Sequence, residues 1–308
     1  MSVRARLRAL VLVGVVALGA ALLTTLGPAG SAGSATVPLA RAAAPGAAIT
    51  GAVAPNCGPR VYYRTTGVRS SCVFADYFGG TALKTSKWTV LTTASTGLGA
   101  APDCMVDSRY NYAVNNGVLK MVTRRNLPPF QCGTGSNAHT ATATSVTIST
   151  YHKFNLQYGR VEIRARFPQL TKPGIQSSLW LWPTRGAQIL NPTGEIDTGE
   201  WYSAYSDRVI PYLHNSAYVV LPPPDTTNTQ CMVPNAWNWH TYVLTWSKSD
   251  LLITYDGRTC LHNTSGSAML QQPYFLVLTQ ALGVYDNAPT ADTPSRAMTQ
   301  IDYVRAWS

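Results

Sequence analysis

Short runs of alternating apolar and polar residues recur along the chain after its first 44 residues, separated by Gly, Pro, Asn and Asp. Alternation of this kind is typical of half-buried β-strands joined by turns. No long segment after the leader repeats its apolar residues with the period of a helix, so few helices are expected. Strand patterns are clearest at 118–123, 145–149, 159–167 and 252–255, and Asp256-Gly257 is a tight hairpin signal.

These patterns predict an all-β fold. About 264 residues follow the leader, a length that suits one large domain. Two antiparallel sheets packed as a jelly-roll β-sandwich would bury one face of each and leave a concave groove for an extended polymer. We expect an irregular extension at 45–72 and the folded domain at 73–308, with no repeat and no separate binding module.

The leader has the layout of a secretory signal peptide. Three arginines, Arg4, Arg6 and Arg8, precede an uncharged run from Ala9 to Leu26, and small residues continue to Ala44. An uncleaved membrane anchor is the competing interpretation, since the apolar run is just long enough to span a bilayer. The small residues favour cleavage, and the absence of paired arginines favours the general secretory route. We therefore expect residues 1–44 to be removed and the protein to be secreted, without stable membrane insertion.

The cysteines agree with an extracellular location. The chain has six, at positions 57, 72, 104, 132, 231 and 260, and an even number in a secreted protein indicates disulfides. Spacing does not determine their pairing. We expect sequential pairing, with Cys57–Cys72 fixing the segment ahead of the domain.

Charge changes the picture little. Removing residues 1–44 takes away four arginines and no acids, which lowers the formal charge from +10 to +6. The remaining Lys and Arg are dispersed, so nucleic-acid binding has no support, whereas anionic polymers or surfaces would be attracted.

Candidate chemistry lies in Gly194-Glu195-Ile196-Asp197-Thr198-Gly199-Glu200-Trp201. In a regular strand Glu195 and Asp197 share a face, whereas Glu200 points away. One extra residue looped out at Thr198-Gly199 restores the parity and brings all three acids to one face, and glycine tolerates the backbone angles that such a bulge often needs.

This arrangement predicts glycosidic bond cleavage. The two glutamate Cα atoms would lie roughly 13 Å apart, and side chains leaning inward would bring the carboxyl groups to about 5–6 Å, the separation of a retaining glycoside hydrolase. The pattern alone also fits a solvated loop or half a calcium site. Context favours catalysis, because only 14 acids occur in 308 residues and three cluster here.

The segment resembles the signature of glycoside hydrolase family 16, which contains laminarinases, lichenases, agarases and transglycosylases, in its bulged E-x-D-x-x-E form. Further similar segments follow in the family's order over about residues 73–308. They are 74–79 with 86–88, the Y-G-x-x-E-x-R strand at 158–168, 178–183, 239–242, 255–257 and 301–305.

The resemblance implies roles for the acids. Glu195 would be the nucleophile, Asp197 its electrostatic helper and Glu200 the general acid/base. It also implies that Trp180 forms a wall on which a sugar ring stacks, which is consistent with the apolar C–H faces of sugars. A core position between the sheets is the alternative for Trp180.

Strand parity adds two candidate substrate-binding residues and one core residue, and the next expected strand adds a third candidate. Trp182 shares the face of Trp180, and Tyr202 shares that of Glu200. His214, on the next expected strand, is a candidate for a hydrogen bond to substrate or to an acid, and a purely structural role is equally open. Trp201 should point into the core.

Other positions depart from the laminarinase pattern. Gln176 and Leu190 stand where many such enzymes carry tryptophan, and Thr279 and Val284 differ near the last cleft strand. The polysaccharide is therefore not fixed by the resemblance. Asp302 matches a family residue that binds a structural calcium ion, although Tyr77 replaces an acid common near that site. The chemistry itself requires no cofactor.

We therefore expect a secreted, monomeric, endo-acting retaining hydrolase of β-glucan, most of all β-1,3-glucan. Two enzymatic alternatives remain, a hydrolase of another wall polysaccharide such as galactan or agar, and a wall-remodelling transglycosylase. An alternative of another class is a non-catalytic glycan-binding protein.

Overall fold

The structure is a computed structural model that describes residues 55–58, 70–184, 194–215 and 226–308. The expected signal segment lies outside the described residues, and so does Leu190. Within the described part, no helix is long and apolar enough to cross a membrane. The described helices are few, as the sequence predicts, and all are short, with α2 (Thr93–Thr96) the one α-helix among them.

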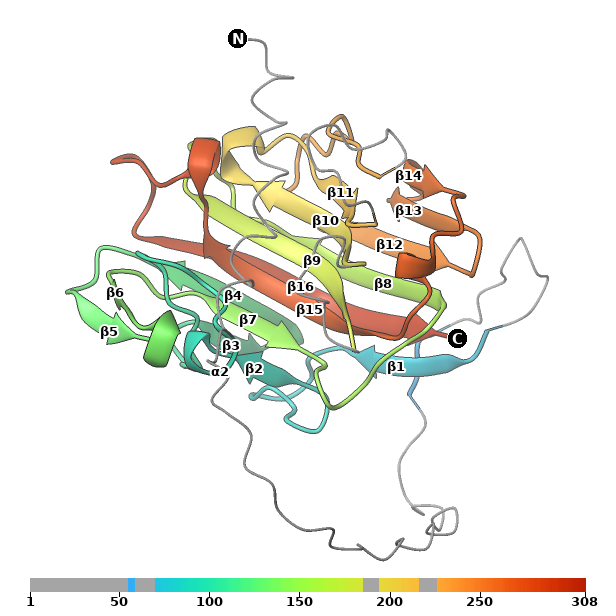
Figure 1. Ribbon diagram of the computed structural model, residues 1–308, viewed down its shortest axis with the longest axis horizontal. Coiled ribbons are helices and arrows are strands. Elements are labelled where there is room, and N and C mark those ends of the chain that lie inside the picture. Colours follow the sequence, from blue (N-terminus) through green and yellow to red (C-terminus); the bar gives the residue numbers. More distant parts are fainter. Residues whose placement is uncertain (1–54, 59–69, 185–193, 216–225) are drawn as a thin grey trace, which may run out of the picture.

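Two antiparallel sheets make up most of the described chain (Figure 1). The larger has eight strands in the order β14-β13-β12-β8-β16-β4-β3, with β1 also paired to β16. Its strands are β1 (Cys72–Asp76), β3 (Tyr112–Asn115), β4 (Val118–Arg124), β8 (Gly159–Arg166), β12 (His240–Trp246), β13 (Leu251–Tyr255), β14 (Arg258–Asn263) and β16 (Arg296–Trp307).

The second sheet has six strands in the order β11-β10-β9-β15-β7-β2. They are β2 (Thr89–Leu91), β7 (Val146–Ser149), β9 (Ile175–Pro183), β10 (Ile196–Tyr202), β11 (Ile210–Leu213) and β15 (Tyr274–Leu282). A separate ribbon pairs β5 (Phe130–Cys132) with β6 (His139–Ala141). The expected all-β antiparallel architecture is confirmed.

The core fills the space between the sheets. Trp201 of β10 is fully buried, as predicted, and its ring stacks on Phe167 at 5.7 Å between centroids. Phe167 in turn contacts Tyr242 of β12, with centroids 5.5 Å apart. Leu179 and Leu181 of β9 join the same cluster. Because alternate residues of β9 and β10 enter this core, the residues between them face away from it.

The hairpin turn between β13 and β14 has the conformation that its sequence predicts. Asp256 and Gly257 have φ angles of 49° and 80°. Two successive positive φ angles are typical of a type I′ turn, whose twist matches that of the flanking strands.

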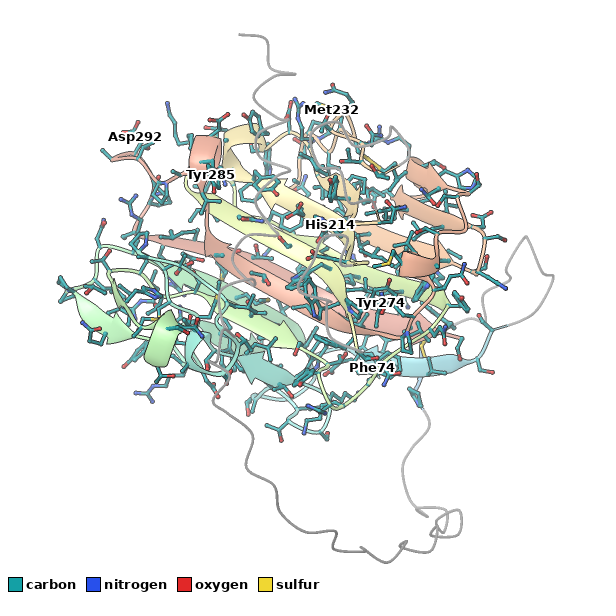
Figure 2. The ribbon with its side chains drawn as sticks, in the orientation of Figure 1. Phe74, His214, Met232, Tyr274, Tyr285 and Asp292 are labelled. Carbon is teal, nitrogen blue, oxygen red and sulfur yellow. A yellow bond between two sulfur atoms is a disulfide. The ribbon has the colours of Figure 1, made fainter. Side chains whose placement is uncertain are left out.

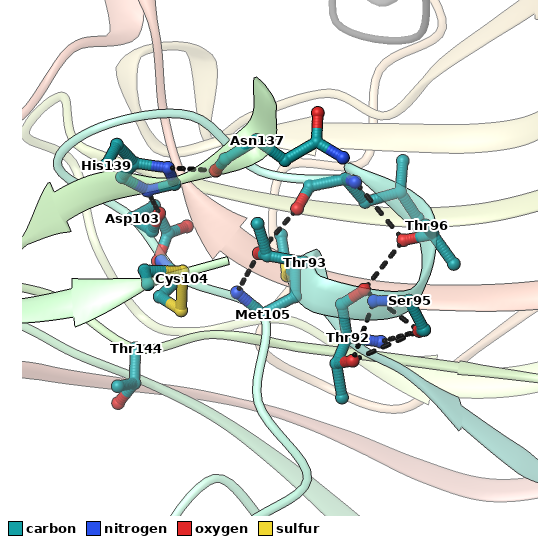
Figure 3. The surroundings of a disulfide bond; sticks show 12 residues. Thr92, Thr93, Ser95, Thr96, Asp103, Cys104, Met105, Asn137, His139 and Thr144 are labelled. Carbon is teal, nitrogen blue, oxygen red and sulfur yellow. Dashed lines mark hydrogen bonds between the residues drawn. A yellow bond between two sulfur atoms is a disulfide. The ribbon is translucent and has the colours of Figure 1, made fainter. Parts of the chain in front are cut away.

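All three expected disulfides form, in the sequential pairing: Cys57–Cys72, Cys104–Cys132 and Cys231–Cys260. Cys57 is buried against Ala75 and Trp307, so the first disulfide fixes the N-terminal segment to the strand pair β1 and β16. The second ties the β5–β6 ribbon to the residues before it. Beside it His139 donates a ring N–H to the carbonyl of Asp103 (Figure 3).

Replacing both Cys57 and Cys72 by serine should lower the free energy of unfolding by about 2–4 kcal/mol, because a closed loop of this size restricts the unfolded chain. Urea unfolding followed by tryptophan fluorescence measures the change. A stability loss that vanishes when both proteins are compared with reductant present attributes the effect to the disulfide. Equal stability under oxidising conditions would contradict it.

Candidate active site

The three acids lie around a β-bulge in β10. Asp197 pairs with Tyr212 and Glu200 with Ile210, so that Thr198 and Gly199 together face the single residue Pro211 on β11. On the other side, Asp197 pairs with Trp180 and Gly199 with the adjacent Leu179. Thr198 is therefore the extra residue, and the predicted bulge is confirmed.

The physical reason for Gly199 differs from the expected one. Its φ angle is not positive. Instead, a Cβ atom at this position would lie 2.7 Å from Cγ1 of Val209 and 3.0 Å from the hydroxyl of Tyr255. Glycine is required because the core approaches the bulge too closely for a side chain.

The hydroxyl groups of two buried tyrosines donate hydrogen bonds to backbone carbonyls of this segment. The Tyr255 hydroxyl, on β13 of the other sheet, donates to the Thr198 carbonyl at 2.8 Å. The Tyr274 hydroxyl, at the start of β15, donates to the Gly194 carbonyl at 2.6 Å. Figure 2 labels Tyr274, and His214 near the acids. Bonds at both ends fix the path of the chain that carries the acids.

Glu195, Asp197 and His214 form a compact cluster. One ligand atom from each lies within 4.8 Å of the others, and all three residues are buried. Nε2 of His214 is 3.0 Å from Oδ2 of Asp197 and 3.6 Å from Oε2 of Glu195. The backbone supports this contact, because the amide of His214 donates to the Glu195 carbonyl at 3.0 Å. His214 therefore contacts the acids, one of the two interpretations left open by the sequence.

Glu200 lies on the same side but is more open to solvent. Its Oε1 accepts a hydrogen bond from Nε2 of Gln176 at 3.0 Å, and its carboxyl group also bonds to the hydroxyl of Tyr202. Tyr202 is thus on the predicted face, but it is itself buried and touches the acid directly.

Burial makes the acids hard to ionise. It raises the pKa of Asp197 to about 8, and with the nearby Asp197 charge it raises that of Glu200 to about 8. Burial first, then the charges of Asp197 and Glu200, raise the pKa of Glu195 well above its usual value. Burial also lowers the pKa of His214 to about 4. At neutral pH His214 is therefore uncharged, and the three acids are partly protonated as a coupled group.

An aromatic hollow of about 420 Å³ is lined by Trp180, the residue that pairs with Asp197 on the neighbouring strand. Trp180 and Trp182 both line it, with ring centroids 5.7 Å apart in an edge-on arrangement. Nε1 of Trp180 donates to Oγ1 of Thr279 at 3.0 Å, which orients the ring. Both tryptophans are thus partly exposed on the cleft face rather than buried between the sheets. The other lining residues are Leu91, Ser95, Thr96, Leu98, Tyr151, Pro183, Thr184 and Phe275.

Asp302, the expected calcium ligand, pairs with a cation of the protein. Oδ2 of Asp302 accepts a hydrogen bond from Nη1 of Arg164. A guanidinium group in contact with this carboxylate repels a second cation, so the placement gives the calcium prediction no support. In the described residues, the one cluster with three side chains suited to a metal is Glu195, Asp197 and His214.

Sequence reasoning missed three residues that shape the site. Gln176 was noted as an altered position but not as a partner of Glu200. The strand register could have placed it, since Gln176 pairs with Tyr202 and lies diagonally from Glu200. Tyr255 and Phe275 carry no local signal, because their contacts with the site depend on how the strands pack.

Comparisons with known proteins agree with this geometry. The model of the family described as glycosyl hydrolases family 16 matches residues 105–305. Among characterised relatives, glucan endo-1,3-beta-glucosidase A1 of Niallia circulans is 26% identical over 263 residues, 76% of this chain and 37% of that protein. Endo-1,3-1,4-beta-glycanase ExsH of Rhizobium meliloti is 24% identical over 197 residues, 64% of this chain and 39% of that protein.

A third relative acts on a different polymer by name. Keratan-sulfate endo-1,4-beta-galactosidase of Sphingobacterium multivorum is 25% identical over 221 residues, 65% of this chain and 51% of that protein. The chain thus spans only part of the length of each of these relatives. Among solved structures, endo-beta-1,3-glucanase from Pyrococcus furiosus superposes with a TM-score of 0.67 at 20% identity, covering 81% of this chain and 97% of that one. This similarity confirms the jelly-roll fold.

Tyr255→Phe should destabilise the protein by about 1–3 kcal/mol, because the buried Thr198 carbonyl loses its donor. Tyr242→Phe is a matched control. The two rings lie 4.9 Å apart, but the buried Tyr242 hydroxyl has no hydrogen-bond partner among the residues that the structure describes, so its removal should cost little. Urea unfolding of both variants gives the comparison. Equal losses would contradict a specific role for the Tyr255 hydroxyl.

Glu200→Gln should stabilise the protein above pH 4, increasingly so up to about pH 8. The raised pKa of Glu200 means that its proton stays bound in the folded state while the unfolded state releases it, so stability is lost as pH rises through this window. Thermal unfolding from pH 4 to 8.5 should show a melting temperature at least about 2–4 °C above wild type at pH 8 and little difference at pH 4.

Glu162→Gln is the control for this experiment. Burial alone would raise the pKa of Glu162, but hydrogen bonds from Arg160, Arg305 and Tyr303 bring it below the usual value. Its replacement should therefore destabilise the protein at neutral pH. A Glu200→Gln variant that behaves in the same way would show that Glu200 is not held in its protonated form.

Proposed function

The chain belongs to glycosyl hydrolases family 16, and from this premise we propose that it is an endo-acting β-glucan hydrolase that cleaves β-1,3-glucan with retention of configuration. The observation that carries the proposal is the bulge in β10, which brings Glu195, Asp197 and Glu200 to one face beside Trp180. The names of the relatives support the choice of a β-glucan.

In the first chemical step, a carboxylate oxygen of Glu195 attacks the anomeric carbon of the sugar. The bond from that carbon to the bridging oxygen breaks, and Glu200 transfers its proton to the departing oxygen. In the second step Glu200, now ionised, takes a proton from water. The water oxygen attacks the same carbon, the ester to Glu195 breaks, and both carboxyl groups return to their starting states.

Glu195 must be ionised to attack, although burial and the neighbouring charges of Asp197 and Glu200 raise its pKa. Since burial holds the proton on one of the two neighbouring acids, the proton must reside on Asp197 for Glu195 to attack. Neutral His214, with Nε2 3.0 Å from Oδ2 of Asp197, is a suitable acceptor for that proton's hydrogen bond. The positive charge that develops on the sugar further favours the ionised form of Glu195.

The aromatic hollow is the proposed sugar-binding subsite. Trp180 and Trp182 line it together with the hydroxyl-bearing residues Ser95, Thr96 and Thr184. Sugar rings combine apolar C–H faces with hydroxyl groups, so this lining suits them on both counts. Neither chemical step requires a bound cofactor.

A galactan is the second candidate substrate. The keratan-sulfate endo-1,4-beta-galactosidase supports it by name, and Gln176 and Thr279 alter the cleft relative to the laminarinase pattern. Neither substrate changes the roles of the three acids.

We also propose that the protein acts outside the cell as a monomer. Its three disulfides support this location, because such bonds persist in oxidising compartments.

Glu195→Gln should lower the rate of laminarin hydrolysis at least about a thousand-fold, since removal of a catalytic nucleophile can cost on the order of 10⁶ in kcat. Purified residues 45–308, with disulfides formed, are incubated with laminarin, lichenan, agarose and galactans, and products are sized by mass spectrometry. Trp201→Phe, a core change, controls for general damage to the fold.

Short products from laminarin that disappear with Glu195→Gln support the proposal. Release from galactans alone would support the second substrate, and products larger than the input would indicate transfer to sugar instead of water. Binding of glucan by a wild type that cleaves nothing would identify a glycan-binding protein. Full activity of Glu195→Gln would refute the nucleophile.

A further inference from the structure

Gln176 extends the catalytic arrangement beyond the three acids. We propose that it is a positioning residue that holds the carboxyl group of Glu200 through Oε1, so that Oε2 carries the proton exchanged with the substrate. The inference deepens the proposed function and rests on it for the role of Glu200, but the contact itself can be tested without catalysis.

The strand register brings the two side chains together. Gln176 pairs with Tyr202, and Ser178 pairs with Glu200, so Gln176 and Glu200 are diagonal neighbours on one face of β9 and β10. Long side chains span such a diagonal. Nε2 of Gln176 lies 3.0 Å from Oε1 of Glu200 and 3.4 Å from Oγ of Ser178.

The amide nitrogen serves both chemical steps. It only donates hydrogen bonds, so Oε1 must accept whether Glu200 is protonated or ionised. In the acid form the proton is then on Oε2, and in the basic form Oε2 is the oxygen that receives one. Without this hydrogen bond the carboxyl group could rotate and present either oxygen to the substrate. The proton would then be less well oriented for transfer.

A neutral donor is the right type for this position. A Lys or Arg within 3 Å would favour the carboxylate strongly and remove the proton that the first step needs. An apolar residue would oppose the effect of burial less, and the carboxylate of the second step would be harder to form. The amide lowers the pKa of Glu200 without adding a charge, and the hydrogen bond from the Tyr202 hydroxyl also lowers it.

The composition of the chain makes the contact measurable. It contains only three glutamates, at positions 162, 195 and 200. Labelling glutamate with ¹³C at the side-chain carboxyl therefore gives three signals, and Glu200→Gln identifies that of Glu200. NMR titration of wild type and Gln176→Met then compares the protonation of Glu200 in the full folded protein.

Loss of the donor should raise the titration midpoint of Glu200 by about 0.5–1 unit. The midpoint of Glu162 should stay unchanged, because its partners Arg160, Arg305 and Tyr303 lie on the other sheet. Gln131→Met, the same substitution on the exposed β5–β6 ribbon, should move none of the three. Gln176→Leu also lacks the donor and serves if Gln176→Met does not fold.

Kinetics give the second readout. Gln176→Met should lower kcat about ten-fold with less than about a two-fold change in KM, since the effect acts on proton transfer rather than on sugar binding. The basic limb of the kcat/KM profile should move up in pH with the NMR midpoint. A purely structural role would lower stability without moving that limb.

An unchanged Glu200 midpoint in folded Gln176→Met and Gln176→Leu would overturn the inference. A shifted midpoint in a protein that cleaves none of the polysaccharides would support the contact while refuting the proposed hydrolase. A shifted midpoint with an unmoved pH limb in an active enzyme would refute the positioning role. The two proposals therefore fail in distinguishable ways.

Discussion

The bulge at Thr198 and Gly199 is the constraint on which the rest of the site depends. Without it, Glu200 would face the core and Glu195 the cleft. The bulge is stabilised because the Thr198 carbonyl accepts a hydrogen bond from the Tyr255 hydroxyl and because Gly199 leaves room for that hydroxyl. Tyr255 belongs to the other sheet, so the alignment of the acids is set by the packing of the whole sandwich. The packing of the buried core thus determines the positions of the acids in the cleft.

Burial of the acids opposes folding and enables chemistry. Asp197 and Glu195 are almost fully enclosed, next to each other and to an uncharged histidine. Holding protons on such groups at neutral pH lowers the stability of the fold, and active sites commonly carry this disadvantage. The fold tolerates this loss of stability because the buried acids lie on one face of the segment, whereas the other face contributes Ile196 and Trp201 to the core.

Much of the molecule could be predicted from the sequence, because the relevant signals are local. Strand alternation predicted the two sheets and the buried Trp201, and parity predicted the bulge and the shared face of the three acids. The hairpin at Asp256 and Gly257 has the φ angles that its residues favour. Contacts between distant segments were beyond reach. The roles of Tyr255 and Phe275 and the pairing of Asp302 with Arg164 depend on sheet packing and on long side chains, which no local pattern encodes.

Glu162 and Glu200 show how environment, rather than residue type, assigns function in this chain. Glu162 lies on the eight-stranded sheet among Arg160, Arg305 and Tyr303, whose hydrogen bonds bring its pKa below the usual value despite burial. Glu200 lies on the six-stranded sheet, where burial and then Asp197 raise the pKa, against smaller opposing effects of Tyr202, His214 and Gln176. The first is a permanent anion suited to an ion-pair network. The second keeps a proton near neutral pH, which is the property that a general acid needs. The same side chain on the two sheets therefore supplies stability in one place and reactivity in the other.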